Sequence, residues 1–420
     1  MHKETQFPPE VQQQLDRIGQ TEILVGLCTH NHCRTAGTVL RTIRKGLEDH
    51  FPKYRSLVVV ADGGSTDGTL PSVADCIPQD QLILFPQPLF PAVRMHVPHH
   101  GLPAKAQSLS SILEISKALD ARVCLLIDAD SESVKSDWVE LMLHPVLEEG
   151  FDYVAPAYQR HKYDGTLTTG LLYPLTRALY GERIRQPIAQ DMAISQSMAA
   201  HFLKQDVWHT QLLANCPDLW MTTVAITQGF KVCQCLLGPK LQTPRPHGGD
   251  LSHLLTQVVG GVFELMETYH SVWTRVAQSQ PSPIFGLPQD FRIEPIQVNT
   301  GRMIEAFNQG IVDLTGVWEE FLSPEVLERL GHLASLPSSE FRFEDSLWVR
   351  TVFEFAVAFH NSRIDRTHIL KSMTPIYLGR TASFVLEMDR STPAEVENRI
   401  ELLCLEFEEL KPLLIESWKR

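Results

Sequence analysis

The segment Arg122-Val123-Cys124-Leu125-Leu126-Ile127-Asp128-Ala129-Asp130 decides the fold, because an unbroken apolar run ends abruptly in two carboxylates separated by one residue. Five consecutive apolar residues bounded by charge are typical of a strand that is buried on both faces. In open α/β sheets, ligands bind just beyond the carboxyl ends of such strands. We therefore expect Asp128 and Asp130 to lie at the mouth of a binding site.

Two carboxylates this close repel each other unless a cation lies between them. Oxygen-rich pairs of this kind suit Mg²⁺ or Mn²⁺ that carries a substrate diphosphate. The simpler interpretation is a turn after a strand with both acids solvated, because short motifs often occur by chance. The segment alone leaves both interpretations open.

The first third of the chain alternates apolar runs with helical patterns. The apolar runs predict strands at 22–28, 57–61, 82–85, 123–127 and 152–158, and the patterns between them predict helices near 34–49, 105–119 and 137–149. Strands that alternate with helices of a dozen residues or more predict a mostly parallel sheet covered by helices on both faces. The fold class expected is therefore α/β.

The chain changes character towards its carboxyl end. After a predicted strand at 231–237 come an amphipathic helix at 250–276 and a proline-rich linker at 281–295, and residues from 303 onward read as almost entirely helical. We divide the chain into a polar lead-in at 1–21 with a short helix from Pro9, an α/β domain at 22–249, and a helical region at 250–420.

Composition narrows the function classes. The 420 residues are 43% hydrophobic, which suits a globular protein, and 37 basic against 50 acidic residues give a formal net charge of −13. This balance argues against a general nucleic-acid binder, which needs basic surface to neutralise phosphates. The eight cysteines are scattered without the spacing of a disulfide framework or a zinc site. The polar amino terminus and the lack of an apolar run near the roughly 18 residues that span a bilayer predict a cytoplasmic protein with no membrane partner.

Polar motifs directly follow three of the predicted strands. Thr29-His30-Asn31 follows the first strand, Asp62-Gly63-Gly64-Ser65-Thr66-Asp67-Gly68-Thr69 the second, and the two acids the strand that ends at Ile127. Asp62 is placed to accept hydrogen bonds from a ribose or a base. The alternative is that Asp62 and Asp67 only order the glycine-rich turn.

This order of motifs resembles the nucleotide-sugar domain of family-two-like glycosyltransferases, the GT-A fold. Five further motifs narrow the resemblance: Arg160, Arg183-Ile184-Arg185-Gln186-Pro187-Ile188, Asp218-Leu219-Trp220, Gln228-Gly229 and Leu237-Gly238-Pro239-Lys240. Together they resemble the retaining GT-A enzymes of the mannosylglycerate synthase, glucosyl-3-phosphoglycerate synthase and glucosylglycerate synthase group. The resemblance spans residues 22–270, followed by a helical carboxyl-terminal region.

The resemblance implies a hexosyltransferase that moves glucose or mannose from a nucleotide-diphosphate sugar to glycerate or 3-phosphoglycerate, with Mg²⁺ or Mn²⁺ as cofactor and a compatible solute as product. It places Asp62 at the nucleoside, Lys105 at the phosphates and Asp128 near the ribose. Cation chemistry supports the role of Lys105, because a departing diphosphate needs neutralisation. The alternative for Lys105 is a solvated lysine in the first turn of a helix, where the helix dipole disfavours a cation.

The resemblance also assigns the remaining site residues. Asp130 holds the metal, Arg160 grips the acceptor carboxylate with Thr166 or Thr168 beside it, and Asp218 lies near the sugar hydroxyls and the acceptor. Guanidinium suits a carboxylate because it can bind it with two parallel donors. The alternative to acceptor binding is that Arg160 is a surface arginine after a strand. The alternative for Asp218 is that it caps a helix. The further contacts to the nucleotide sugar are Thr29, Gln186 and Asp191.

The sequence departs from this group at two places. A histidine usually completes the metal site, whereas Gln242 stands at the aligned position and His247 follows five residues later. A glutamine oxygen is a possible but weaker ligand for Mg²⁺, and His247 could supply the imidazole instead if its loop folds back. Ala189-Gln190-Asp191 stands where a glycine pair and an acid are expected, so a side chain enters where backbone would approach the sugar.

Several competing functions stay open on these residues. One is a catalytically weak or inactive relative that only binds nucleotide sugar, and another is a transferase with a different acceptor. An inverting transferase of lipid or polysaccharide would commonly have a membrane segment, and a phosphatase of the haloacid dehalogenase type would carry its two acids on the first strand. The apolar faces of the carboxyl-terminal helices are compatible with a homodimer.

Overall fold

The structure, a computed structural model, describes residues 7, 9–78, 81–86, 105–210, 212, 215–241, 251–288, 296–361 and 363–419. The chain forms two compact units. The sheet unit comprises Met1–Gln159, Ile184–Pro246 and Ser282–Phe291, and the helical unit comprises Arg160–Arg183, His247–Pro281 and Arg292–Arg420.

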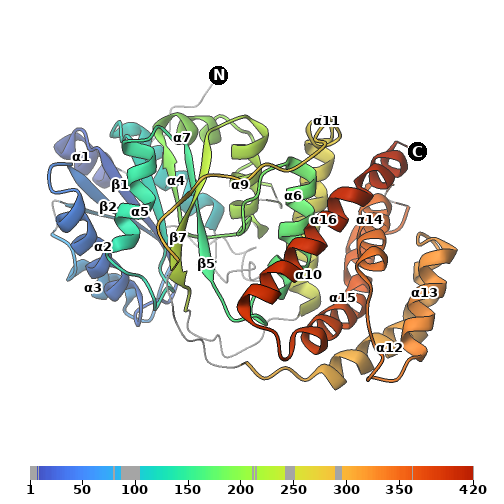
Figure 1. The fold of residues 1–420 in the computed structure, drawn as a ribbon. Coiled ribbons are helices and arrows are strands. Elements are labelled where there is room, and N and C mark those ends of the chain that lie inside the picture. The colour runs from blue at the N-terminus through green and yellow to red at the C-terminus, as the bar shows by residue number, and fades with distance from the viewer. Residues whose placement is uncertain are drawn as a thin grey trace. The chain divides into compact units, whose positions relative to one another are not determined.

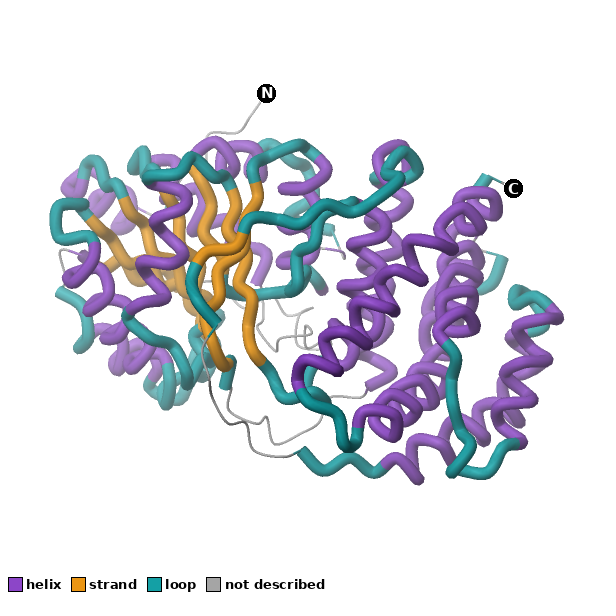
Figure 2. Tube along the Cα trace, viewed as in Figure 1, coloured by secondary structure: helices purple, strands orange, loops and turns teal. Residues whose placement is uncertain are grey.

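These units differ from the sequence divisions at residues 22 and 250, because residues 1–21 belong to the sheet unit, the later division falls after Pro246, and two further segments change unit. Residues 160–183 join the helical unit, and residues 282–291 join the sheet unit. That the predicted boundaries separate independently folding domains stays a prediction. Figure 2 shows the strands in one unit and helices throughout the other.

The strands of the sheet unit are β1 (Ile23–Thr29), β2 (Ser56–Asp62), β3 (Leu82–Pro86), β4 (Val123–Asp128), β5 (Tyr153–Gln159), β6 (Met192–Ser195), β7 (Val232–Pro239) and β8 (Ile284–Phe285). Its helices are α1 (Pro9–Ile18), α2 (Ala36–His50), α3 (Thr69–Ala74), α4 (Lys105–Ala118), α5 (Asp137–Leu147), α7 (Gln196–Leu203) and α9 (Pro217–Thr227) (Figure 1). The strands and helices predicted for this unit form within a few residues of their expected bounds, whereas the helix predicted at 250–276 forms as two helices, Leu251–Thr268 and His270–Trp273.

The strand order is β3-β2-β1-β4-β6-β5-β7-β8. Every pair is parallel except the two pairs made by β6, which runs antiparallel to β4 and to β5. The chain moves outward from β1 to β3 and then returns to β4 on the other side of β1. Because the strand order reverses there, the carboxyl ends of β1 and β4 flank the crevice where open α/β sheets bind ligands. The predicted α/β class, a mostly parallel sheet flanked by helices with a helical carboxyl-terminal region, is confirmed.

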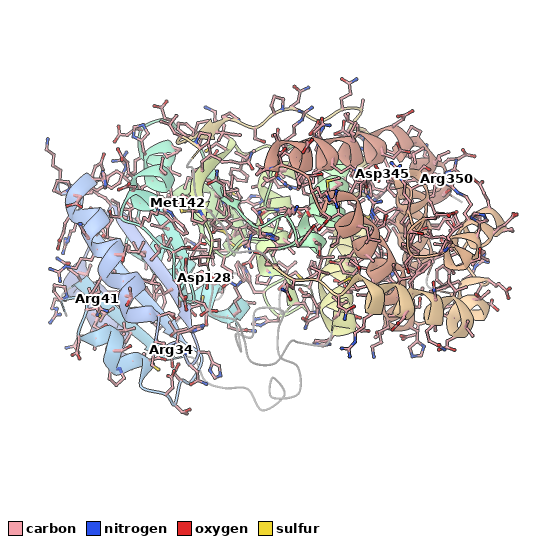
Figure 3. The ribbon with its side chains drawn as sticks, turned by 60° about the horizontal axis from the view of Figure 1, so that its bottom comes forward. Arg34, Arg41, Asp128, Met142, Asp345 and Arg350 are labelled. Carbon is pink, nitrogen blue, oxygen red and sulfur yellow. The ribbon has the colours of Figure 1, made fainter. Side chains whose placement is uncertain are left out.

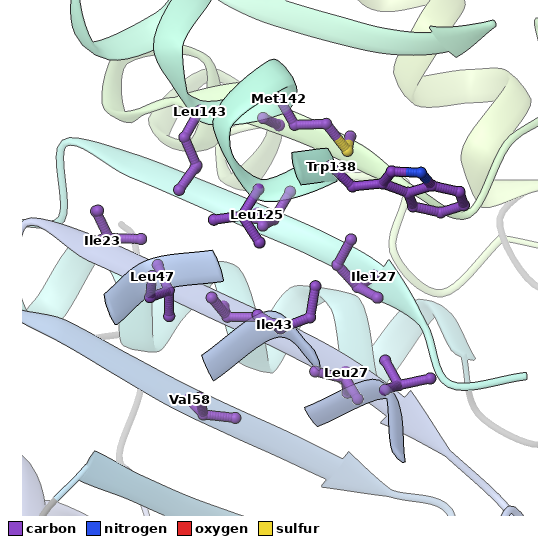
Figure 4. Close-up of a cluster of buried hydrophobic side chains, with 14 of the residues drawn as sticks. Ile23, Leu27, Ile43, Leu47, Val58, Leu125, Ile127, Trp138, Met142 and Leu143 are labelled. Carbon is purple, nitrogen blue, oxygen red and sulfur yellow. The ribbon is translucent and has the colours of Figure 1, made fainter. Parts of the chain in front are cut away.

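Helices α2 and α5 cover one face of the sheet. Their apolar side chains form one core cluster with alternate residues of β1, β2 and β4, and those labelled in Figure 4 are Ile23, Leu27, Ile43, Leu47, Val58, Leu125, Ile127, Trp138, Met142 and Leu143. The opposite face of β1 meets α4 so closely that a Cβ added to Gly26 would lie 2.5 Å from Ile112 Cγ2. The apolar run of the deciding segment is therefore covered from both sides, as its sequence predicts.

Two strands arise where the sequence predicts none. β6 is a run of four residues that is too short to show a period, and β8 lies inside the segment predicted as a proline-rich linker. β8 pairs with β7 through Gln234↔Ile284 and Cys235↔Phe285. Main-chain pairing of so few residues leaves no hydrophobic pattern in the sequence.

The helices of the helical unit are the π-helix Thr168–Leu172, α6 (Tyr173–Tyr180), α10 (Leu251–Thr268), α11 (His270–Trp273), α12 (Thr300–Trp318), α13 (Pro324–Ser335), α14 (Asp345–Asn361), α15 (Arg366–Met388) and α16 (Pro393–Trp418). Among the helices of the described residues, none has the length and apolar character that crossing a membrane requires.

A buried arginine joins α6 to α16 within the helical unit. The side chain of Arg177 is fully buried, and its guanidinium lies 2.5 Å from Glu401 Oε2 and 2.7 Å from Glu408 Oε1. Arg177 Nε also donates to Ser279 Oγ at 3.0 Å. One side chain thus holds three segments of the unit together.

Replacing Arg177 by methionine is expected to destabilise the helical unit by about 3–5 kcal/mol, because the carboxylates lose a buried counter-charge. Urea unfolding followed by circular dichroism measures this. The matched control is Arg183→Met, whose side chain is 36% exposed and lies 4.0 Å from Glu401. Equal losses in the two variants would contradict the special role of Arg177.

Candidate active site

The polar residues predicted for a nucleotide site meet at the carboxyl edge of the parallel strands. Thr29, the last residue of β1, pairs in register with Asp62 of β2, and Cys28 pairs with Asp128 of β4. Figure 3 labels Asp128 within the sheet unit. The backbone therefore brings Thr29, Asp62 and Asp128 to one edge, as the sequence predicts.

Asp62 is buried and organises the turn after β2. Its carboxylate accepts hydrogen bonds from Thr29 Oγ1 at 2.7 Å, from the amide of Ser65 at 2.8 Å and from the amide of Gly64 at 3.1 Å. Asp67 accepts in the same way from the amides of Cys33 and Thr69. Both acids thus order the glycine-rich turn, which was the simpler interpretation. Contact of Asp62 with a nucleoside stays a prediction.

The carboxylates after β4 have an internal cation that the sequence analysis did not assign. Lys240 directly follows β7, and its Nζ lies 3.1 Å from Asp128 Oδ2 and 2.6 Å from Asp191 Oδ2. The side chains of Lys240 and Asp128 are each only 3% exposed. Lys240 therefore neutralises Asp128 from within the chain, whereas a divalent ion beside the two acids stays a prediction.

Electrostatics fix the charge states of this pair. Burial alone raises the pKa of Asp128, but the Lys240 ammonium and the amide of Asp130 hold that pKa below its ordinary value. Burial likewise lowers the pKa of Lys240, and Asp128 with Asp191 outweigh it and raise that pKa. Both groups are therefore charged at neutral pH.

Asp191 is completely enclosed by donors. Its Oδ1 accepts from the amide of Asp128 at 2.8 Å, and its Oδ2 accepts from the Tyr158 hydroxyl and from Lys240. The residue has no exposed surface. In this arrangement Asp191 ties strand ends together, and its predicted contact with a nucleotide sugar stays a prediction that would require one of these bonds to break.

Lys105 and Asp218 form a second buried ion pair. Lys105 Nζ donates to both carboxylate oxygens of Asp218, at 2.8 and 2.7 Å, and both side chains are less than 5% exposed. Lys105 starts α4, and Asp218 lies in the first turn of α9. The solvated-lysine interpretation of Lys105 is therefore wrong. Cys216, the residue before α9, forms no side-chain cap, and the Asp218 carboxylate accepts from Lys105.

The thiol of Cys28 lies in the same region as these two ion pairs. Burial raises its pKa to about 12, with Lys105 opposing and the nearby Asp218 and Asp128 adding to the shift. A thiol with this pKa is uncharged at neutral pH and is a poor nucleophile. An uncharged thiol of this kind packs as a small apolar side chain.

The other predicted contacts divide between the units. Gln186 is buried in the sheet unit, in the loop before β6. Arg160, Thr166 and Thr168 belong to the helical unit, where Arg160 Nη1 lies 3.0 Å from Asp164 Oδ2. Thr166 Oγ1 and the Tyr377 hydroxyl are 2.8 Å apart, and Thr168 begins the π-helix.

The predicted metal site is only partly described. Gln242 and His247 lie outside the described residues. Within the described part of the chain, no group of three or more histidine, cysteine, aspartate and glutamate side chains is placed to hold a metal ion. Mg²⁺ in nucleotide sites is usually held by one or two carboxylates together with substrate phosphates. Asp128, the last residue of β4, and Asp130, two residues later, supply the two carboxylates that such a site uses, and their binding of a metal stays a prediction.

Sequence reasoning missed Lys240 and Tyr158 as members of the site. A signal for Lys240 was present, because it is a charged residue directly after an apolar run, as Asp128 is. Tyr158 gave no signal, since an aromatic residue in a buried strand is ordinary. Its hydroxyl becomes relevant only through the bond to Asp191.

The chain is similar to solved structures of other proteins. No protein-family model matches the sequence, and no curated protein matches it. Glucosyl-3-phosphoglycerate synthase from Mycobacterium tuberculosis, solved in complexes with Mn²⁺, UDP and glucosyl-3-phosphoglycerate and with Mg²⁺ and UDP, is 19% identical at a TM-score of 0.43, over 64% of this chain and 86% of that chain. Mannosyl-3-phosphoglycerate synthase from Rubrobacter xylanophilus gives 19% identity and a TM-score of 0.43, over 64% of this chain and 82% of that one. The chain thus resembles solved structures of glucosyl-3-phosphoglycerate synthase and mannosyl-3-phosphoglycerate synthase.

Proposed function

We propose that this protein is a metal-dependent retaining glycosyltransferase that moves a hexose from a nucleotide-diphosphate sugar to a small carboxylate acceptor such as glycerate or 3-phosphoglycerate. The observation that carries the proposal is the position of Asp128 and Asp130 at the carboxyl end of β4, beside the point where the strand order reverses. That crevice is where nucleotides bind in open α/β sheets.

The charges at this edge support a cation-assisted diphosphate site. Five carboxylates and two ammonium groups gather in the sheet unit, namely Asp62, Asp128, Asp130, Asp191, Asp218, Lys105 and Lys240. An excess of buried negative charge is costly unless cations offset it. A divalent ion brought by the diphosphate would provide that offset.

In the proposed reaction the chain contributes binding, orientation and charge. Asp62 and Thr29 receive the nucleoside, and Lys105 lies at the start of α4, where its ammonium can approach a phosphate oxygen. A Mg²⁺ or Mn²⁺ ion held by Asp130 would supply Lewis-acid stabilisation of the departing diphosphate. Arg160 and a threonine hydroxyl would orient the acceptor, whose hydroxyl oxygen bonds to C1 of the hexose on the face that the diphosphate leaves. The bond from C1 to the diphosphate breaks, and the hydroxyl proton passes to the departing diphosphate oxygen. Positioning of the two substrates and stabilisation of the developing charge are sufficient to accelerate the transfer.

The test is turnover with a panel of UDP-, GDP- and ADP-linked glucose and mannose, each with glycerate or 3-phosphoglycerate, with and without Mn²⁺. We expect Mn²⁺-dependent release of one nucleoside diphosphate together with a glycosylated acceptor. Nucleotide binding without turnover across the panel would contradict the transferase proposal.

A second candidate is a relative that binds nucleotide sugar without turnover. Two observations favour it: Lys240 occupies the space beside Asp128, and Lys105 is bonded to Asp218 rather than open to a phosphate. The same panel separates the candidates, because the second predicts tight binding in calorimetry and no product.

The role of Arg160 is tested by Arg160→Lys. Lysine keeps the positive charge but lacks the two parallel donors that grip a carboxylate, so the KM of the acceptor is expected to rise about ten-fold. The KM of the nucleotide sugar stays unchanged, and initial rates at varied acceptor concentration measure both. Arg390→Lys, an exposed change in the same unit, is the control. An unchanged acceptor KM in Arg160→Lys would remove Arg160 from the site.

A further inference from the structure

Lys240 is the charged residue at the strand edge to which the proposed reaction gives no role. Its ammonium lies between Asp128 and Asp191, at 3.1 and 2.6 Å from their Oδ2 atoms. Its Nζ is also 5.2 Å from the ring centroid of Tyr158 and 5.9 Å from that of Trp138. Two carboxylates and two aromatic faces thus enclose one buried cation.

This enclosure is specific, because each partner is itself held in place. The Tyr158 hydroxyl donates to Asp191, and the Trp138 indole donates to the carbonyl of Leu237 at 2.7 Å. Asp191 in turn accepts from the amide of Asp128 at 2.8 Å. A buried ammonium is costly unless paired and bonded in this way. Lys240 therefore has a fixed position, unlike a lysine on a solvated surface.

The arrangement resembles a metal site in which a lysine takes the cation's place. Lys240 Nζ lies against Asp128 Oδ2, whereas Asp128 Oδ1 accepts from the amide of Asp130. A divalent ion that approached Asp128 would face the ammonium at close range. At separations of a few ångströms that repulsion is substantial even when it is well screened.

We infer that Lys240 is a positioning residue that acts as a built-in counter-cation: it fixes Asp128 and lowers the affinity of the site for a free divalent ion. The inference rests on the proposed function. Because the ammonium opposes a free ion, the ion binds tightly only when a diphosphate supplies additional negative charge. Lys240 thereby couples metal binding to nucleotide binding.

The test measures Mn²⁺ binding directly, by the electron paramagnetic resonance signal of free Mn²⁺, without UDP and with saturating UDP. In the absence of UDP, Lys240→Met is expected to bind Mn²⁺ about ten-fold more tightly than the unaltered protein, because a unit positive charge beside Asp128 is removed. Its gain in Mn²⁺ affinity on adding UDP is expected to be smaller. Lys240→Arg keeps the charge and is expected to behave as the unaltered protein does.

Lys117→Met is the matched control, since Lys117 is an exposed lysine at the end of α4 in the same unit. It removes the same charge from a position that solvent and salt screen, so its Mn²⁺ affinity is expected to stay unchanged. Circular dichroism and thermal melting establish that each variant is folded. If Lys240→Met does not fold, Asp191→Asn is tested in its place. This variant removes the charge of one of the two carboxylates that contact Lys240 and keeps that of Asp128. Mn²⁺ binding without UDP is then expected to weaken.

The outcomes separate this inference from the proposed function. A folded Lys240→Met variant with unchanged or weaker Mn²⁺ affinity would overturn the inference while the unaltered protein still bound Mn²⁺ with UDP. Asp191→Asn binding Mn²⁺ as tightly as the unaltered protein would overturn it as well. If the unaltered protein bound no Mn²⁺ with any nucleoside diphosphate of the panel, the inference and the metal-dependent transferase would both fail.

Discussion

In the proposed reaction, replacing Asp130 by asparagine is expected to lower the rate of hexose transfer roughly 100-fold or more, because the metal site proposed at the diphosphate would lose its anionic ligand. The asparagine side chain has nearly the same size as the aspartate that it replaces, and the backbone amide that donates to Asp128 stays in place. The fold is therefore expected to survive. Initial rates at saturating nucleotide sugar, with Mn²⁺ titrated over a wide range, measure the loss, and higher Mn²⁺ is expected to restore part of the rate.

The matched control is Asp49→Asn, an exposed acid near the end of α2 in the same unit. This change is expected to leave the rate and the Mn²⁺ dependence unaltered. If Asp130→Asn kept full activity with an unchanged Mn²⁺ requirement, the metal would be held elsewhere. If both variants lost activity equally, overall charge and not a specific ligand would explain the effect.

The sequence predicts the sheet well because its strands are unusual in composition. β4 is a continuous apolar run buried on both faces. The two acids that follow the apolar run are therefore expected at the carboxyl end of the strand. The same holds for β2 and the turn that begins at Asp62. Where burial on both faces dictates the residue types, local pattern alone reveals the element.

The partners of these acids could not be predicted in the same way. Lys105 and Asp218 are 113 residues apart in the chain, and Asp128 and Asp191 are 63 apart. Which cation reaches which carboxylate depends on how α9 and the short antiparallel β6 pack against the sheet. β6 left no periodic signal, so the position of Asp191 beside Asp128 was invisible in the sequence. The acids were predictable from their place on strands, whereas their charge partners follow from packing.

The pairing of Lys105 with Asp218 leads to the second large effect. Lys105→Met is expected to destabilise the sheet unit by about 3–5 kcal/mol at neutral pH, because it leaves the buried Asp218 carboxylate without its partner. It is also expected to abolish turnover, since the proposed reaction would lose the ammonium that it assigns to the phosphates. Urea unfolding and the panel assay measure the two effects separately.

The loss of stability is expected to depend on pH. Burial raises the pKa of Asp218 above its ordinary value; Lys105 opposes this, and the charges of Asp128 and Asp191 add to it. Removing Lys105 removes the opposing charge, so the pKa of Asp218 rises further in the folded variant. Between the unfolded and the folded pKa the folded state then binds more protons than the unfolded state, and the free energy of unfolding falls as pH increases. The variant is therefore closest to the unaltered protein in stability below roughly pH 4, where aspartate is protonated in both the folded and the unfolded state, and it falls further behind as pH rises above that value.

A double variant separates charge from function. Lys105→Met combined with Asp218→Leu replaces both partners of the ion pair by apolar side chains, a change that is often nearly neutral for stability. We expect it to recover most of the lost stability and to lose the added pH dependence, yet to remain inactive, because neither the ammonium nor the carboxylate is present. Recovery of turnover in the double variant would show that the pair serves the fold alone. A single variant whose stability did not vary with pH would show that Asp218 finds another partner when Lys105 is absent.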